Sequence, residues 1–241
     1  MSTPIIEITN LGKLYRLSHR TRPDSLKAYL KGLVGQGGAR SLSAESEDFW
    51  ALRDINLTVD KGQCLALIGK NGSGKSTLLK VISRVTPPST GCIRVRGKVA
   101  SLLEVGTGFH HELTGRENIF LNGAMLGCSR AEMQRRFDAI VEFSGVERFL
   151  DTPVKHYSSG MYVRLAYSVA AHVDADIMVV DEVLAVGDSE FQQKCFGHLS
   201  NLRKRRQSAI FVSHSPDIVR RLATHVAELE GGRLINFSPF A

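Results

Sequence analysis

The chain has 241 residues, of which 43% are hydrophobic and 23% charged, and its formal net charge is +7. This length suits one α/β domain with a full core, and the basic balance suits a nucleic acid, an anionic lipid headgroup or an acidic ligand. Membrane-spanning runs of roughly 20 apolar residues, a signal peptide at the N-terminus and closely spaced cysteine pairs are all missing from the sequence.

The N-terminal part predicts a strand at residues 5–9, followed closely by Tyr15. Tyr15 is placed either to stack on an adenine ring or to pack beneath a sheet. Within an inserted segment at about residues 17–48, apolar residues recur at helical spacing and basic residues lie between them, so we expect a short amphipathic helix over 23–34. That helix would either lie at a membrane surface or on a partner helix, or pack against its own domain. Residues 35–48 are rich in small and polar residues and predict a mobile loop.

A strand is predicted over 49–59, and an apolar run at 64–68 leads directly into the sequence GKNGSGKST. This stretch fits the pattern G-x-x-x-x-G-K-[ST] in full and is followed by a helical run. The glycines let successive backbone N–H groups point at phosphate oxygens, and the helix adds its positive N-terminal end. We therefore expect a nucleoside triphosphate site in which Lys75 reaches the β- and γ-phosphates and Ser76 holds Mg²⁺. The expected phosphate-binding residues are Gly69, Lys70, Asn71, Gly72, Ser73, Gly74, Lys75, Ser76 and Thr77.

The rest of the chain alternates between strand and helix signals. Two strands are expected around Gly97, a glycine-rich bend at 105–111, and a helical region from Thr114 to Phe149, whose second helix opens with a capping box at Ser129. Helices are then predicted over 162–172, 191–205 and 216–223, strands over 177–180 and 209–212, and a hairpin near 226–236. Because the strands at 177–180 and 209–212 are apolar throughout, both of their faces should be buried, as in a parallel, doubly wound sheet.

Three ionisable residues follow buried strands. Asp181 and Glu182 end the strand at 177–180, and His214 ends the strand at 209–212. Chemistry gathers at such strand ends in parallel sheets. Beside the phosphate loop, Asp181 is expected to hold Mg²⁺, Glu182 to orient or deprotonate the attacking water, and His214 to contact the γ-phosphate. Taken alone, the acidic pair is more typical of a capped turn, and a single histidine is more typical of a structural residue.

These residues together resemble the ATP-binding subunit of an ABC transporter, and the likeness extends from Ile5 to about Leu234. The phosphate loop resembles Walker A, and residues 179–182 resemble Walker B with the catalytic glutamate. Residues 184–188 lie where the D-loop is found, and His214 matches the switch histidine. Tyr15 matches the adenine-stacking aromatic, with Trp50 as the reserve. The signature motif reads YSSGM, and its expected ATP-contacting residues are Ser158, Ser159, Gly160 and Met161.

Departures from the general pattern point to one branch. Glu104 stands near the place of the usual Q-loop glutamine, as a further candidate metal contact. The stretches SLLEVGTGFHHELTGRENIFLNG, DTPVKHYSSGMYVRLAYSVAAH and DEVLAVGDSEFQQKC are similar to ATPases that export O-antigen, capsular polysaccharide or teichoic acid. That branch carries an inserted gating helix, which suits residues 23–34. The resemblance implies a P-loop NTPase fold with a mostly parallel core sheet, an antiparallel β-subdomain and a helical subdomain at about residues 112–175.

The resemblance also implies ATP and Mg²⁺ as ligands and a head-to-tail homodimer. Its other implied partners are two copies of a separate transmembrane permease, docked near residues 99–120, and a lipid-linked polysaccharide, at the cytoplasmic face of the cell membrane. No nucleic-acid partner is expected. The alternatives are an ABC ATPase for another transported substrate and a soluble ABC ATPase. We expect one ATPase domain without a C-terminal carbohydrate-binding domain, since the sequence ends at Ala241; the protein is either of the short type or part of a longer chain.

Overall fold

The computed structural model describes residues 3–19, 45–103, 106–181, 188–204, 207–213 and 215–240. The expected helix at 23–34 and the site candidates Glu104, Glu182 and His214 lie outside these ranges, as does most of the D-loop-like stretch. Within the described residues, no helix combines the length and the apolar character that crossing a bilayer requires.

A three-stranded antiparallel sheet is formed by β1 (Ile6–His19), β2 (Glu45–Val59) and β4 (Thr90–Val95), in the order β2-β1-β4. The strands β1 and β2 pair along their whole length, and Tyr15 lies opposite Phe49. They are longer than expected: residues 17–19 and 45–48, predicted as part of the insertion, belong to strands. The strands extend this far because each supplies the hydrogen-bond partners of the other.

The core is a six-stranded sheet with the order β5-β6-β7-β3-β8-β9. All neighbouring pairs are parallel except the hairpin of β8 and β9. This sheet confirms the predicted parallel arrangement and the C-terminal hairpin. Its strands are β3 (Cys64–Ile68), β5 (Val99–Ser101), β6 (Ile177–Val180), β7 (Ser208–Val212), β8 (His225–Glu230) and β9 (Arg233–Pro239).

The central strands are apolar throughout because both of their faces are covered. In β6, Ile177 and Val179 pack into one core with α2 (Lys75–Ile82), while Met178 and Val180 face a second core. That second core includes residues of α6 (Ser189–Lys204) and α7 (Pro216–Leu222). Each core gains from apolar area removed from water, at about 25 cal/mol per Å². The sheet is therefore anchored on both sides, with the ends of its strands available for the site.

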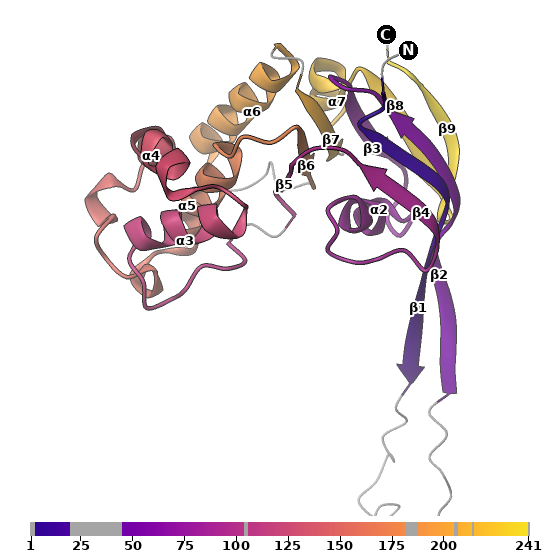
Figure 1. Cartoon of the computed structure of the whole chain (residues 1–241), viewed down its shortest axis with the longest axis horizontal. Coiled ribbons are helices and arrows are strands. Elements are labelled where there is room, and N and C mark those ends of the chain that lie inside the picture. Colours follow the sequence, from indigo (N-terminus) through magenta and orange to yellow (C-terminus); the bar gives the residue numbers. More distant parts are fainter. Residues whose placement is uncertain are drawn as a thin grey trace, which may run out of the picture.

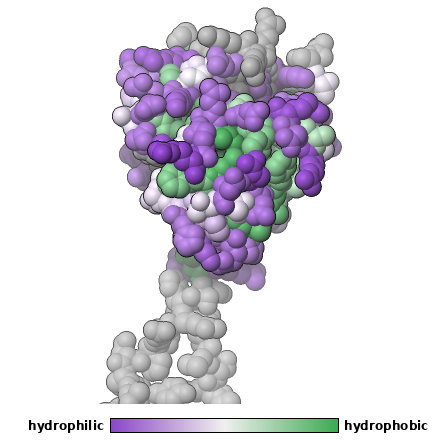
Figure 2. Space-filling view, turned by 90° about the vertical axis from the view of Figure 1, so that its left-hand side faces the viewer, coloured by the Kyte–Doolittle hydropathy of each residue, from purple (hydrophilic) through white to green (hydrophobic). Residues whose placement is uncertain are grey.

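A helical subdomain projects from the edge of this sheet, on the left in Figure 1. It consists of α3 (Gly115–Met125), α4 (Arg130–Ser144) and α5 (Ser159–Ala171), with short 3₁₀ turns at Glu147–Phe149 and Val154–His156. Thr114 and Ser129 open α3 and α4 with complete capping boxes, as the sequence predicts for Ser129. Figure 2 views the molecule from this side and shows apolar side chains surrounded by polar ones.

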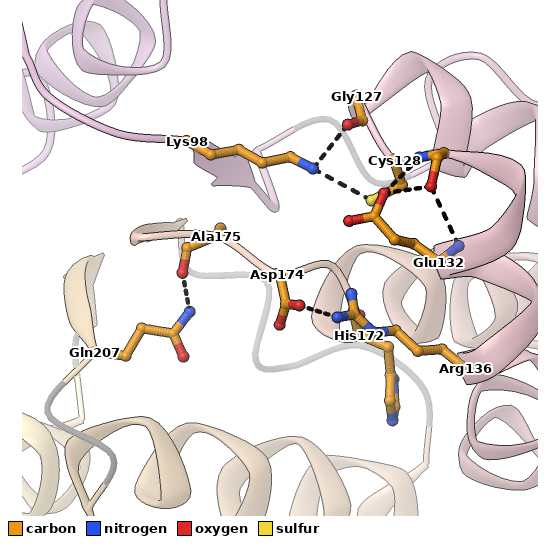
Figure 3. A network of polar contacts seen from close by, with 10 residues as sticks. Lys98, Gly127, Cys128, Glu132, Arg136, His172, Asp174, Ala175 and Gln207 are labelled. Carbon is orange, nitrogen blue, oxygen red and sulfur yellow. Dashed lines mark hydrogen bonds and ion pairs between the residues drawn. The ribbon is translucent and has the colours of Figure 1, made fainter.

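Polar contacts tie this subdomain to the core sheet (Figure 3). The Lys98 ammonium, just before β5, donates to the Gly127 carbonyl oxygen at 3.0 Å and approaches the Cys128 sulfur at 3.3 Å. On the other side, the Arg136 guanidinium of α4 donates to the His172 carbonyl oxygen at 2.9 Å and pairs with Asp174. Contacts just before β5 and just before β6 thus hold the helical subdomain against the sheet.

Candidate nucleotide-binding site

The loop between β3 and α2 has a backbone that only glycine adopts easily. Gly69, Gly72 and Gly74 have φ values of 142°, 79° and 105°. At Gly74 a Cβ atom would lie 2.7 Å from the Ala51 carbonyl oxygen and 2.8 Å from a Leu52 methyl carbon. The loop therefore folds tightly against β2 and then turns directly into α2.

The interior of this loop has the polar groups that a phosphate requires. The Lys75 side chain is 7% exposed, and its ammonium donates to the carbonyl oxygens of Gly69 at 2.8 Å and Lys70 at 3.0 Å. The buried Ser73 hydroxyl has no hydrogen-bond partner within the described part of the chain. The first turn of α2 carries no carboxylate and no side-chain cap, so its N–H groups remain available. These residues fit a bound polyphosphate.

A cleft of about 500 Å³ brings the phosphate loop together with the strand end at Asp181. Ser76, Thr77 and Asp181 all line it, alongside Lys75. The sheet order explains the meeting, because β7 is the neighbour of both β3 and β6. One hydroxyl and one carboxylate suit Mg²⁺, which is commonly held by one or two protein oxygens together with substrate phosphates.

An aromatic residue that was not among the expected ones lines this cleft. Phe49, which is 49% exposed, lines the cleft, whereas Tyr15 is its cross-strand neighbour and is not among the lining residues. The Lys13 ammonium lies 5.2 Å from the Tyr15 ring centroid. Trp50 packs over Gly12, where its ring leaves no space for a Cβ. Phe49 was not singled out from the sequence, although it alternates with Ala51, which also lines the cleft. The adenine-stacking role expected for Tyr15, with Trp50 as the reserve, stays a prediction.

The signature-like residues form a second, separate cleft at the start of α5. Ser158 caps this helix by accepting a hydrogen bond from the Met161 N–H at 3.2 Å. The cleft has a volume of about 460 Å³ and is lined by Ser158, Ser159, Gly160, Met161, Val163, Arg164 and Asp188. Among the described residues, none lines both this cleft and the cleft at the phosphate loop. The structure thus brings Lys75, Ser76 and Asp181 together and leaves residues 158–161 apart from them.

A third cleft indicates where the remaining strand end lies. Gly69, Lys75 and Ser213 line a cavity of about 340 Å³ beside the phosphate loop. Ser213 follows β7 and immediately precedes His214, so the chain reaches the edge of the nucleotide site at this point. The side chains of Glu104, Glu182 and His214 lie outside the described residues, and their expected roles stay predictions.

Comparisons with known proteins agree with this geometry. Residues 52–185 match the protein family described as "ABC transporter". The chain is 42% identical to the O-antigen export system ATP-binding protein RfbB of Klebsiella pneumoniae, over 96% of this chain and 92% of that protein. It is 39% identical to the teichoic acids export ATP-binding protein TagH of Lactiplantibacillus plantarum, over 95% of this chain and 60% of that protein.

The fold is also found in solved structures. The ATP-binding cassette MJ0796, solved as a dimer in a post-hydrolysis state bound to ADP and Pi, superposes with a TM-score of 0.73 at 20% identity, over 98% of this chain and 99% of that one. At that identity the likeness shows the fold alone. The family match and the close relatives show more: the chain belongs to the ABC transporter family, as one of its ATP-hydrolysing nucleotide-binding domains.

Proposed function

We propose that this protein is the ATPase subunit of an ABC transporter that exports a lipid-linked polysaccharide of the O-antigen, capsule or teichoic acid type. The observation that carries the substrate class is the identity of about 40%, over nearly the whole chain, to proteins named for O-antigen and teichoic acid export. Such a subunit works with two copies of a separate permease at the cytoplasmic face of the cell membrane.

In this proposal, the phosphate loop and the Lys75 ammonium hold the β- and γ-phosphates of ATP at the N-terminus of α2. Ser76 and Asp181, which line one cleft, hold Mg²⁺. The cation, when bound, neutralises charge that develops on the transferred phosphoryl group. Glu182 orients and deprotonates the attacking water, His214 contacts the γ-phosphate, and Glu104 takes the place of the Q-loop glutamine near the cation. A positioned base of this kind contributes about 10²–10⁴-fold to the rate.

The two separate clefts support a dimer in which each ATP is shared. The signature-like residues are too remote from the phosphate loop to line its cleft within one chain. The first turn of α5 nevertheless carries no carboxylate, and the positive end of the helix dipole favours an anion there. We infer that residues 158–161 of one copy cover ATP bound at residues 69–77 of the other, and that closure drives the permease.

The direct experiment replaces Lys75 by Ala in the host cell and in the purified protein. Loss of the buried ammonium should lower kcat for ATP by at least about 10²-fold, since it removes a preorganised charge from the transition state. In cells, the lipid-linked polysaccharide should accumulate inside and disappear from the surface. Gly197→Ala, at an open and exposed position of α6, serves as the control and should behave as wild type. Normal surface polysaccharide in the Lys75→Ala strain would exclude the proposed substrate class.

A further inference from the structure

Tyr162 follows the signature-like residues directly and reaches a segment far away in sequence. Its hydroxyl donates a hydrogen bond to the Gly106 carbonyl oxygen, 2.9 Å away. Its ring packs edge-on against Phe109, with centroids 5.3 Å apart, and stacks on His111 at 6.1 Å. Three contacts from one side chain of α5 thus fall on residues 106–111, which we name the 106–111 loop.

The loop is shaped to receive this ring. Gly106 has a φ of 87°, and a Cβ atom there would lie 2.5 Å from the Tyr162 ring. A side chain at this position would therefore push the ring away. Burial raises the pKa of the Tyr162 phenol above its usual value, so the hydroxyl stays protonated and able to donate at physiological pH. The contact between Tyr162 and Gly106 therefore requires both a glycine at position 106 and a protonated phenol.

On its other side, the 106–111 loop is fixed to α3 by two buried asparagines. The Asn118 amide accepts from the His110 N–H at 2.7 Å and donates to the His110 carbonyl oxygen at 3.1 Å. Asn122 donates to the Thr107 carbonyl oxygen at 3.1 Å. These bonds hold the loop against α3. The His111 carbonyl oxygen also accepts a hydrogen bond from the Lys155 N–H, just before α5.

We propose that Tyr162 is a positioning residue that couples the 106–111 loop to the first turn of α5. The inference rests on the proposed function, in which that turn covers the ATP of a second copy. A shift of Met161 or Gly160 toward the nucleotide displaces the adjacent Tyr162, and the ring cannot move without disturbing Gly106, Phe109 and His111. Closure over ATP is thereby transmitted to the 106–111 loop, and a push on the loop is returned to the ATP site.

Hydrogen exchange of the loop amides tests this coupling. In Glu182→Gln protein, which should bind ATP without turnover, ATP should slow exchange at residues 158–162 and also at the 106–111 loop. We expect the loop effect to be about tenfold, which corresponds to one hydrogen bond of ordinary net strength. Adding Tyr162→Ala should preserve the slowing at 158–162 and abolish it at the loop. Tyr162→Phe, which keeps the ring contacts, should retain part of it.

A second variant changes the residue that Tyr162 contacts, and a third serves as the control. Gly106→Ala should reproduce Tyr162→Ala, because the added methyl group displaces the ring. Ser168→Ala removes a hydroxyl of the same helix that donates to the Arg164 carbonyl oxygen of that helix at 2.6 Å, and it should leave the coupling intact.

Two results would overturn the proposal, and they are distinguishable. If Tyr162→Ala speeds loop exchange equally with and without ATP, so that the ATP-dependent ratio is unchanged, the residue is merely structural. If ATP fails to slow exchange at 158–162 even with Tyr162 present, the shared ATP site is wrong and the coupling falls with it.

Discussion

Gly74 shows how the phosphate loop depends on single backbone positions. We expect Gly74→Ala to abolish measurable ATP binding and to lower the free energy of unfolding by more than the 1–2 kcal/mol or so that a left-handed backbone costs other residues. The excess arises because its Cβ would collide with the Ala51 carbonyl oxygen. Nucleotide titration and chemical denaturation measure the two effects.

Gly145→Ala is the matched control for that prediction. Gly145 ends α4 with a φ of 65°, but a Cβ there would meet no atom of the described residues within 4 Å. The variant should lose only about 1 kcal/mol of stability and bind ATP normally. Equal behaviour of the two variants would show that the collision at Gly74 has no consequence.

For single residues, the sequence predicts which positions belong to a motif better than it predicts which residues become neighbours in space. Lys75, Ser76 and Asp181 meet as expected, because a motif and a strand end fix their places. Phe49 was not singled out because its place at the cleft depends on how β2 lies over the phosphate loop. The contacts of Tyr162 with the 106–111 loop likewise join segments about 50 positions apart, and no local pattern encodes them.

The junction of α4, α5 and α6 holds a histidine whose titration opposes folding. His172 packs against Phe143 of α4 and His198 of α6, and its Nδ1 lies 2.8 Å from the Ser168 carbonyl oxygen. Burial lowers the pKa of His172, and the charge of Arg136 lowers it further, against that hydrogen bond. The unfolded chain therefore binds a proton at higher pH than the folded protein.

The lowered pKa of His172 makes the stability of the folded protein depend on pH. The stabilisation from neutral His172 is complete above about pH 6.5 and is lost as the pH falls below that value toward the lowered pKa. His172→Gln should therefore flatten the decline in unfolding free energy between about pH 7 and pH 5, by at most about 1.4 kcal/mol per pH unit. Denaturation at several pH values measures this change. A decline as steep in His172→Gln as in wild type would contradict the assignment.

Elements were predicted well where their pattern reflects local rules. The capping box at Ser129 and the apolar run of β6 marked a helix start and a buried strand correctly. The prediction was wrong at residues 45–48, where β2 already begins. Polar residues such as Glu47 and Asp48 carry little strand signal, and their pairing with β1 is set by the partner strand.

For the whole molecule, the expected inserted helix at residues 23–34 predicts a separation of activities. Deleting these residues should leave the ATPase rate of the purified subunit within about twofold of wild type, because the phosphate loop, Asp181 and α5 all lie outside the deleted segment. Export, in contrast, should stop. ATPase assays and surface polysaccharide staining compare the two. A parallel loss of both activities would indicate that the segment packs on its own domain.

In the proposed mechanism, one complete nucleotide site needs two copies of the chain. The most direct measurement is the mass of Glu182→Gln protein in solution, by light scattering, with and without ATP. We expect a monomer without ATP, a dimer with ATP, and no dimer when Gly160→Glu is added, although that double variant should still bind ATP through residues 69–77. A protein that binds ATP and stays monomeric, or a dimer that survives Gly160→Glu, would contradict the shared site.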